Sequence, residues 1–254
     1  MQKLTIVVAM MCFISGCIRA PEDLDVAPAI AERKAGAPGP VAKKAAIVYS
    51  DAPTLIKKVS EDHNVPAGAI YGVWSKESNR LASGWGDSRH WMLASDLAKK
   101  GSPCAEIYGL KKCKYRYKAL ASICAQKRPD GSKLCDPEEV RTSYAMALGP
   151  MQHMPDSLLV ETRDGRFRWN SHAVDYDKDG VYDPFSLPDA MAMSAKFLRA
   201  KRDKGQSWTR SINGYYGSQT AGYYEGVAEH WLEWCKEQKG CSQPERRTLY
   251  ALND

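Results

Sequence analysis

The chain has 254 residues, of which 44% are hydrophobic and 26% are charged. This composition excludes a fully disordered chain, and the length allows one well-buried domain with appendages. The formal net charge of +6 is too small to indicate a nucleic-acid-binding protein, so we expect no nucleic-acid partner, whereas a moderately anionic partner suits it.

The first sixteen residues have the pattern of an export signal. Lys3 is followed by an almost unbroken apolar run, residues 4–14, which is too short to span a bilayer as a mature helix. The run ends in Ile14-Ser15-Gly16-Cys17, which resembles the bacterial lipobox, where cleavage exposes a Cys for acylation. We therefore predict a signal peptide over residues 1–16 and a membrane anchor through lipid on Cys17. The alternative is an ordinary secretory signal that ends near a Cys.

The predicted location is the periplasmic side of a bacterial cell envelope. Ile18 follows the predicted lipidated Cys, and the absence of an Asp there favours the outer membrane. Residues 17–49 are rich in Ala, Pro and charge and show no sustained periodicity, so we predict a tether. Residues 50–254 then form a single folded domain.

Four stretches of this domain carry apolar side chains at helical spacing. They are Leu55, Ile56 and Val59; Ile70, Val73 and Trp74 after Pro66; Leu187, Met191, Ala195 and Leu198 before Gly205; and Tyr224, Val227, Trp231 and Trp234. Strand patterns are scarce, and residues 84–141 show weak periodicity that predicts short helices and loops. The predicted fold class is mainly α.

Six cysteines remain once Cys12 leaves with the signal and Cys17 is lipidated. An even set in an exported protein predicts disulfides, and local loops favour the sequential pairing among several possible ones. The pairs would be Cys104–Cys113, Cys124–Cys135 and Cys235–Cys241. No C-x-x-C pattern occurs, so zinc or redox chemistry is not indicated.

Glu77 occupies an unusual position in the helix that follows Pro66. It lies seven residues after Ile70 and so continues the apolar stripe, which turns its carboxyl inward. Burial without a cation raises the pKa of a carboxyl, and a protonated carboxyl near neutral pH can act as a general acid. Periodicity alone also allows a Glu at a helix end that reaches solvent or pairs with Arg80.

Three segments resemble motifs of the lytic murein transglycosylases. Glu77-Ser78 resembles the family's Glu-Ser motif; Gly149-Pro150-Met151-Gln152-His153-Met154-Pro155-Asp156-Ser157 resembles its second motif; and Asn213-Gly214-Tyr215-Tyr216 resembles its Ala-Tyr-Asn motif. The order and spacing agree over about residues 50–234. Two departures stand out, since Tyr216 or Gly217 replaces the motif Asn, and His153 occupies a position where an apolar residue is common.

The resemblance implies a lysozyme-like single catalytic domain with disulfide-stapled insertions. It also implies that Glu77 is the single acid/base residue in cleavage of the MurNAc–GlcNAc β-1,4 bond of peptidoglycan glycan strands, with formation of 1,6-anhydroMurNAc ends. No cofactor is required for this reaction. The expected substrate-binding residues are Ser78, Met151, Gln152, Tyr215 and Tyr216. Whether the enzyme serves general wall turnover or an envelope-spanning machinery stays open.

An Asp-rich segment matches the opening of a calcium loop. Asp175, Asp177 and Asp179 stand at positions 1, 3 and 5, Val181 would offer its carbonyl at position 7, and Asp183 stands at position 9. Ser186 replaces the usual bidentate Glu at position 12, which weakens the expected site. Some members of the resembled family carry a similar loop before an Asp-Pro. The hypothesis is a structural calcium site; the alternative is an acidic turn.

Three other functions stay open from sequence. A lysozyme-like muramidase would need a second carboxylate to hold water, for which Asp156 or one of Asp175, Asp177 and Asp179 is available. A non-catalytic peptidoglycan-binding lipoprotein would keep the groove without using Glu77. A calcium-loop adhesin would bind a protein partner and cleave no glycan.

Overall fold

The computed structural model describes residues 52–79, 91–216 and 222–238, all of which belong to one compact unit, Pro38–Asp254. The predicted signal peptide, lipidated Cys17 and tether lie outside these residues. Arg80, Gly217 and Cys241 also lie outside them. No described helix is both long enough and apolar enough to cross a membrane.

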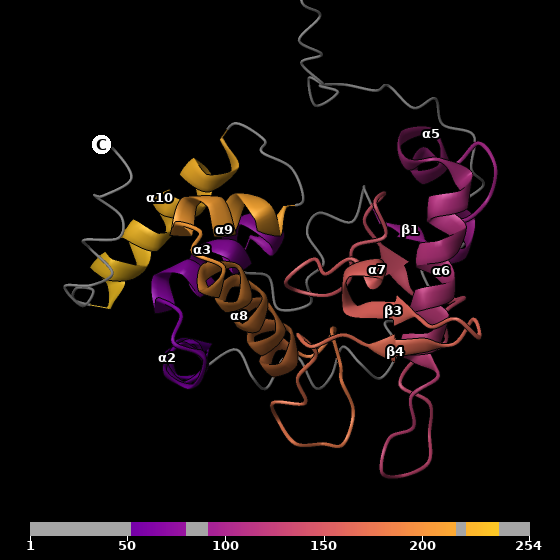
Figure 1. Ribbon diagram of the computed structural model, residues 1–254, viewed down its shortest axis with the longest axis horizontal. Coiled ribbons are helices and arrows are strands. Elements are labelled where there is room, and N and C mark those ends of the chain that lie inside the picture. Colours follow the sequence, from indigo (N-terminus) through magenta and orange to yellow (C-terminus); the bar gives the residue numbers. More distant parts are fainter. Residues whose placement is uncertain (1–51, 80–90, 217–221, 239–254) are drawn as a thin grey trace, which may run out of the picture. The chain divides into compact units, whose positions relative to one another are not determined.

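The described chain is mainly helical, as predicted (Figure 1). The longer helices are α2 (Ala52–His63), α3 (Ala67–Ser78), α6 (Leu110–Cys124), α8 (Leu187–Asp203), α9 (Trp208–Tyr215) and α10 (Tyr223–Glu237). The short helices are α4 (Ala94–Leu97), α5 (Pro103–Tyr108) and α7 (Pro155–Leu158). Two antiparallel pairs of very short strands complete it, β1 (Met92–Leu93) with β2 (Arg141–Thr142) and β3 (Leu159–Glu161) with β4 (Phe167–Trp169).

The four predicted helical stripes correspond to α2, α3, α8 and α10, which confirms them. Pro66 is the N-cap of α3, with an extended ψ of 130°. Gly205 follows the end of α8 with a φ of +76°, a left-handed conformation that glycine adopts without strain.

The prediction of only short helices in residues 84–141 is wrong for α6, which has 15 residues. Its buried face contains Cys113, Arg116, Leu120 and Ile123 among others. A cationic side chain within this face and several lysines around it obscure the apolar periodicity on which a helix is recognised from sequence.

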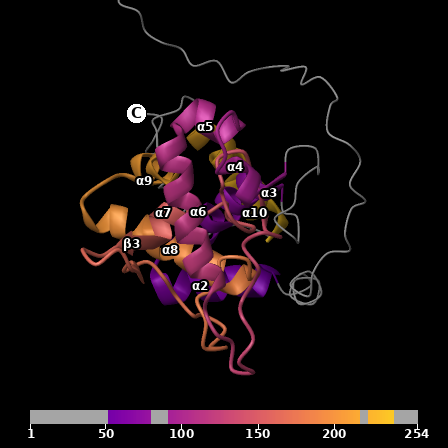
Figure 2. The same cartoon turned by 90° about the vertical axis from the view of Figure 1, so that its right-hand side faces the viewer.

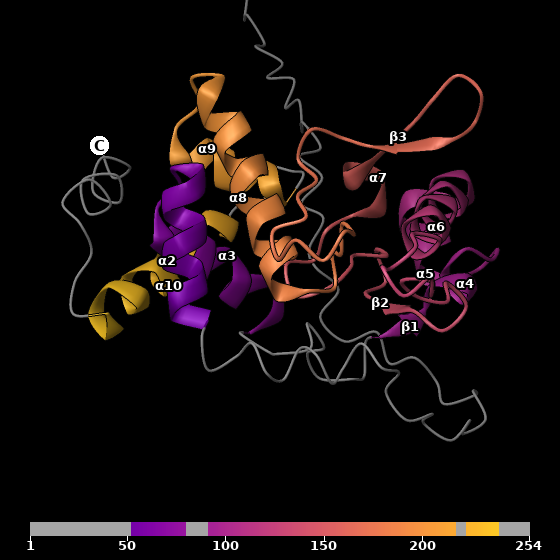
Figure 3. The same ribbon diagram turned by 90° about the horizontal axis from the view of Figure 1, so that it is seen from below.

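The largest hydrophobic cluster joins α2, α3, α8, α9 and α10 and contains Ile56, Ile70, Met191, Ile212 and Trp231. Within it α3 packs closely on α10, and α2 lies beside α3 and α8 (Figure 3). Gly72 makes the α3–α10 approach possible, because a Cβ on it would lie 2.4 Å from the Val227 carbonyl oxygen. The carboxyl end of α3, where Glu77 stands, is thereby fixed on a rigid helix pair.

Two smaller clusters hold the remainder of the described chain. One contains Leu120, Ile123, Leu148 and Leu158, and the other contains Leu97, Cys104, Cys113 and Met146. Disulfides Cys104–Cys113 and Cys124–Cys135 close loops in them, which confirms two of the predicted pairs. Cys235 is disulfide-bonded as well, but its predicted partner lies outside the described residues. The first disulfide joins α5 to α6, and α5 lies at one end of α6 (Figure 2).

Candidate active site

Glu77 is the centre of the candidate site. It lies in the last turn of α3, which ends at Asn79 in a left-handed conformation with φ of +51°. Its side chain is half-buried rather than solvated, as the apolar stripe predicts. The Tyr223 Oη, from the first residue of α10, donates a hydrogen bond of 2.5 Å to Glu77 Oε1.

Burial raises the pKa of the Glu77 carboxyl from 4.5 to about 7. The Tyr223 hydrogen bond and the nearby Lys76 charge lower it, but burial is the larger effect. Among the described residues, no second carboxylate is one of the groups that set this pKa. A carboxyl with these properties holds a proton near neutral pH and can both donate it and take it back.

Tyr223 is the functional residue that sequence reasoning missed. Its own pKa is raised well above the ordinary value by burial and by the Glu77 charge, so its hydroxyl stays protonated and acts as a donor. A signal for it exists in the sequence, since Tyr223 and Val227 are four residues apart on the apolar stripe of the last helix. The resemblance directed attention to Tyr215 and Tyr216 instead.

The second motif folds into a tight loop that rests on the Asp-rich segment. Leu148 and His153 exchange two backbone hydrogen bonds, of 2.8 and 2.9 Å, and enclose the residues between them. Gly149 has a φ of +64°, and a Cβ on it would lie 2.0 Å from the Pro184 carbonyl oxygen. Only glycine satisfies both the left-handed backbone and this close approach, so the loop is built against Pro184.

Tyr215 joins this loop to α8. Its hydroxyl donates to the Met151 carbonyl oxygen over 2.6 Å and lies 2.9 Å from the Ser194 Oγ. The Glu77 charge contributes to the raised pKa of Tyr215, after burial. Tyr215 is therefore close enough to Glu77 to sense its charge, although its hydroxyl serves the loop. The Met151 side chain is fully buried in the main cluster, so it supports the loop from beneath.

His153 is buried and belongs to the same network. Its Nε2 lies 3.0 Å from the Ala190 carbonyl oxygen and 3.1 Å from the Ser194 Oγ. Burial lowers the pKa of His153 to about 4, so the ring is neutral at physiological pH. Because a carbonyl can only accept, the Nε2 carries the proton. His153 anchors the loop on α8.

The other expected substrate-binding residues have distinct environments. Ser78 is buried, and its hydroxyl donates to the Trp74 carbonyl oxygen over 3.0 Å. Gln152, with φ of +50°, donates from its side-chain amide to the Gly149 carbonyl oxygen over 2.8 Å. Tyr216 is 51% exposed, and its ring centroid lies 4.9 Å from that of Tyr223. Of the predicted set, Tyr215 and Tyr216 are the ones whose pKa responds to Glu77.

The candidate second carboxylates are already engaged. Asp156 forms ion pairs with Lys112 and with Arg116, whose Nε lies 3.2 Å from Oδ1. In the Asp-rich loop, Asp175 and Asp177 accept hydrogen bonds from the Asp179 backbone N–H over 3.0 and 3.2 Å. These contacts show that each of these carboxylates stabilises the local structure.

The Asp-rich loop brings together a different set of carboxylates from the predicted one. Oxygens of Asp175, Asp177 and Asp189 lie within 4.8 Å of one another. Asp179 instead accepts from the Val181 N–H over 3.1 Å, and Asp183 accepts from the Phe185 N–H over 2.9 Å. Three convergent carboxylates suit a hard cation such as Ca²⁺, which prefers oxygen ligands.

Asp189 is the second residue that sequence reasoning missed. It is fully buried and accepts hydrogen bonds from the backbone N–H groups of Tyr176 and Asp183, over 2.7 and 2.8 Å. In sequence it stands in the first turn of a helix, where an Asp is ordinarily explained by the helix dipole. Its orientation towards the loop becomes visible only in three dimensions.

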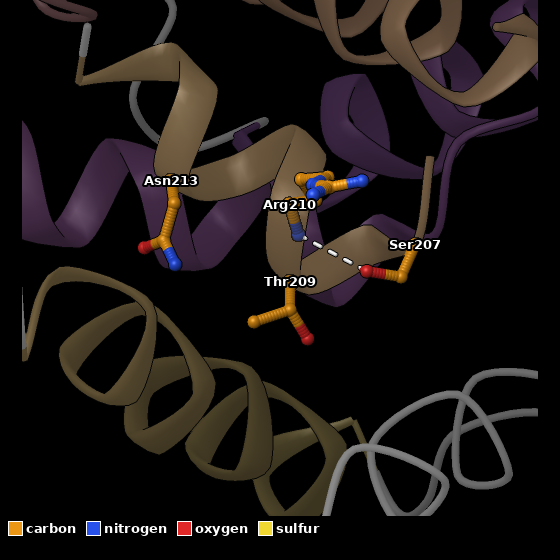
Figure 4. Close-up of a pocket in the computed structure, with 4 residues that line it drawn as sticks. All are labelled: Ser207, Thr209, Arg210 and Asn213. Atoms are coloured by element: carbon orange, nitrogen blue, oxygen red, sulfur yellow. Dashed lines mark hydrogen bonds between the residues drawn. The ribbon is translucent and has the colours of Figure 1, made fainter. Parts of the chain in front are cut away.

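A surface pocket on α9 is separate from this chemistry. The described residues that line it are Ser207, Thr209, Arg210 and Asn213, and Ser207 caps the helix by accepting from the Arg210 N–H (Figure 4). Neither Glu77 nor any predicted substrate-binding residue is among them. We therefore place the candidate reaction at Glu77.

Comparison with known proteins agrees with this geometry. Residues 39–248 match the family model described as the transglycosylase SLT domain. No curated protein sequence matches the chain.

Solved structures of lytic transglycosylases are similar to this chain in fold. The chain is 13% identical to the Escherichia coli lytic transglycosylase Slt35 in complex with bulgecin A, covering 80% of this chain and 76% of that one, with a TM-score of 0.52. The values are the same for Slt35 in complex with calcium. For the soluble lytic transglycosylase SltB1 from Pseudomonas aeruginosa they are 15% identity, 83% and 86% coverage, and a TM-score of 0.53. At these identities the likeness shows the fold alone, and it confirms the predicted fold class.

Proposed function

The chain belongs to the family defined by the transglycosylase SLT domain, that of the peptidoglycan lytic transglycosylases, and from this premise we propose its reaction in detail. It cleaves the MurNAc–GlcNAc β-1,4 bond of glycan strands and leaves 1,6-anhydroMurNAc ends, with Glu77 as the single acid/base residue. The observation that carries this proposal is the half-buried Glu77 carboxyl, whose pKa is raised to about 7 beside the Tyr223 hydroxyl.

In the first step Glu77 donates its proton to the bridging oxygen while the bond from that oxygen to the MurNAc C1 breaks. The GlcNAc side leaves as an alcohol, and positive charge develops at C1. In the second step the Glu77 carboxylate takes the proton of the MurNAc 6-hydroxyl, whose oxygen bonds to C1 and closes the anhydro ring. No water is consumed, and the carboxyl ends protonated for the next turnover.

One carboxylate suffices because the nucleophile belongs to the substrate. A hydrolase of this type would use a second carboxylate to activate water. The engagement of Asp156 with Lys112 and Arg116 supports the internal route. Tyr223, which donates to Glu77, orients the carboxyl and stabilises its charged form between the two steps.

The experiment is digestion of purified sacculi by the wild-type protein, with the products weighed by mass spectrometry. We expect anhydro products, which are one water lighter than hydrolysis products. Glu77→Gln should lower the rate by about 10²–10⁴-fold, because it removes the proton donor and keeps the shape. The matched control is Glu61→Gln, the same change at an exposed position of α2, which should leave the rate unchanged.

Each other outcome identifies a different function. Hydrated products would replace the transglycosylase by a muramidase. Binding of sacculi without cleavage, equal in wild type and Glu77→Gln, would indicate a wall-binding lipoprotein. Affinity for a protein partner without glycan cleavage would indicate an adhesin.

We also propose that the Asp-rich loop binds a structural calcium ion through Asp175, Asp177 and Asp189, whose oxygens converge within 4.8 Å. The ion would offset the mutual repulsion of the carboxylates and brace the loop, and Pro184 of that loop supports Gly149. The similar fold of Slt35 has been seen in complex with calcium, which supports the choice of ion.

The calcium proposal is tested by thermal unfolding with calcium or with a chelator. Calcium should raise the wild-type midpoint but not that of Asp175→Asn or Asp189→Asn, since binding to the folded state stabilises it. Asp203→Asn, an exposed change at the other end of α8, is the control and should respond as the wild type does. A wild-type midpoint that calcium leaves unchanged would refute the site.

The lipid anchor on Cys17 remains a proposal from the lipobox pattern. In a bacterial host, we expect a radiolabelled fatty acid to be incorporated into the wild-type chain and not into Cys17→Ser. Fractionation of the membranes then tests the outer-membrane location that Ile18 favours. Label in both chains would contradict lipidation at Cys17.

A further inference from the structure

Three exposed tyrosines lie near one another beside the Glu77 site. Tyr108, Tyr144 and Tyr216 are 40%, 44% and 51% exposed, whereas the neighbouring Tyr223 is buried. They come from three separate parts of the chain: the end of α5, the segment after β2, and the end of α9. Their shared exposure therefore does not arise from one amphipathic helix.

Tyr108 is held in place by the disulfide-stapled pair α5 and α6. It is the last residue of α5, and Gly109, with a φ of +84°, turns the chain directly into α6. The Cys104–Cys113 disulfide bridges the two helices around this turn. The Arg116 guanidinium lies 4.6 Å from the centroid of the Tyr108 ring and covers one face of it.

The same arginine ties Tyr108 to the segment of Tyr144. Arg116 is buried, and its Nη1 donates to the Ala145 carbonyl oxygen over 2.9 Å. The next residue, Met146, is fully buried in the cluster of Cys104 and Cys113. Tyr108 and Tyr144 are therefore presented by one rigid support, with Arg116 at its centre.

Tyr216 connects this support to the catalytic carboxyl. Its ring lies 4.9 Å from that of Tyr223, which donates to Glu77. Burial raises the pKa of Tyr216, and the Tyr144 phenol and the Glu77 charge raise it further. Burial, Tyr144 and Tyr216 likewise raise the pKa of Tyr108. The phenols of Tyr108 and Tyr216 therefore lie near that of Tyr144, and Tyr216 also lies near Glu77.

We propose that Tyr108 and Tyr144 extend the glycan-binding site beyond Tyr216 and hold sugar rings of the strand remote from the cleaved bond. This inference rests on the proposed function. A tyrosine offers a flat apolar face to a sugar ring and a hydroxyl for its polar edge, at a low cost in side-chain entropy. A glycan strand is the occupant that fits, because it must pass Glu77 and continue beyond it, and Tyr216 lies against Tyr223, the hydrogen-bond donor to Glu77.

The test compares a short substrate with a long one. The wild type, Tyr108→Ala and Tyr144→Ala cleave either a peptide-free tetrasaccharide of two GlcNAc–MurNAc units or longer strands of the same repeat. We expect each Ala variant to lower kcat/KM for long strands by roughly two- to tenfold, which corresponds to the loss of one aromatic contact. Cleavage of the tetrasaccharide should fall less, because fewer of its sugar rings extend past Tyr216.

Two controls separate ring stacking from other effects. Tyr108→Phe and Tyr144→Phe keep the ring and should retain most of the preference for long strands. Ile107→Ala removes a 58% exposed apolar side chain next to Tyr108 on α5 and should leave both rates unchanged. If Tyr144→Ala does not fold, Tyr108→Ala at the exposed end of α5 still decides the outcome.

Failure of the inference differs from failure of the proposed function. Wild-type cleavage with an unchanged preference for long strands in both Ala variants would overturn the role of Tyr108 and Tyr144 alone. An equal loss on both substrates would also overturn it, because it would indicate damage at Glu77. If the wild type cleaves neither substrate, the proposed function itself is refuted.

Discussion

The Glu77 carboxyl depends on two opposing influences at the scale of single residues. Burial raises its pKa to about 7, while the Tyr223 hydroxyl favours the charged form and lowers it. The first makes the group an acid near neutral pH, and the second stabilises it once the proton has left. A reaction that uses one carboxyl as acid and then as base needs both influences.

The pH dependence of activity follows from the raised pKa of Glu77. Only the protonated carboxyl can donate, so kcat/KM should fall as the pH rises through about 7. The free energy of unfolding should also fall as the pH rises. A carboxyl whose pKa is raised in the folded state stabilises the fold fully below pH 4.5, and this stabilisation is lost as the pH rises through about 7. Relative to Glu77→Gln, the wild type should lose up to about 3 kcal/mol across this window.

Two measurements check this prediction. A pH–rate profile on sacculi gives the alkaline limb, and denaturant unfolding at several pH values gives the stability difference. Glu61→Gln is the control for both, since its carboxyl is exposed. An activity that is constant through pH 7 would contradict the assignment of Glu77 as the acid.

Tyr223→Phe tests the effect of the Tyr223 hydrogen bond on Glu77 separately from the effect of burial. Without the hydroxyl, the pKa of Glu77 should rise, so the alkaline limb of the pH–rate profile moves to higher pH. We also expect kcat to fall by roughly ten- to hundredfold, because the carboxyl loses the contact that orients it. Tyr224→Phe, one residue along the helix, is the control. A lower rate with an unmoved limb would mean that Tyr223 only supports the packing.

At the scale of helices, the contact between α3 and α10 positions both members of the Glu77–Tyr223 pair. Gly68 and Gly72 on α3 leave space for Trp231 and for the backbone of Val227 on α10. Neither glycine has a left-handed backbone, so their role is close approach rather than turn formation. Because these two glycines let the helices approach closely, they also set the distance between Glu77 on α3 and Tyr223 on α10.

Gly72→Ala should therefore destabilise the protein although Ala favours helix. A Cβ at this position would lie 2.4 Å from the Val227 carbonyl oxygen, which is backbone and cannot rotate away. We expect a loss of about 1–3 kcal/mol in the free energy of unfolding, measured with denaturant. The control is Gly214→Ala in α9, where the nearest atom lies 3.8 Å away and a gain of up to about 1 kcal/mol is expected. A stable Gly72→Ala protein would show that the helices can separate freely.

At the scale of the whole described chain, different clusters serve different parts of the site. The main cluster holds α3 and α10 and so fixes Glu77 and Tyr223, whereas the Cys104–Cys113 and Cys124–Cys135 disulfides lie in the smaller clusters. Helix α8 spans two of these clusters, with Met191 in the main one and Met193 in another. The Glu77–Tyr223 pair and the disulfide-bonded support of Tyr108 are thus built on separate hydrophobic clusters.

Removal of the Cys104–Cys113 disulfide should separate these contributions. Cys104→Ala with Cys113→Ala should lower the free energy of unfolding by about 2–4 kcal/mol. Cleavage of the tetrasaccharide should persist, because the main cluster does not contain these cysteines. Denaturant unfolding and the tetrasaccharide assay measure the two effects. Loss of tetrasaccharide cleavage in a folded double variant would show that the clusters depend on each other.

The sequence by itself determined the helical architecture, the first two disulfide pairs and the inward direction of Glu77. These features depend on local periodicity and on short loops, both of which can be read from residues that are close together in the sequence. Helix α6 is the exception, because Arg116 and the surrounding lysines interrupt its apolar pattern. The motif resemblance then directed attention to the segments of Met151 and Tyr215, both of which lie in one hydrogen-bonded network.

Only the tertiary structure decided which side chains meet. Tyr223 reaches Glu77 from a helix 146 positions away in the chain, and Asp189 turns back from α8 to join Asp175 and Asp177. Arg116 joins Tyr108 to the Tyr144 segment in the same manner. Such contacts depend on how closely helices approach and in which direction a side chain leaves its backbone. No periodicity encodes these two quantities, because they are set by the packing of distant residues against one another.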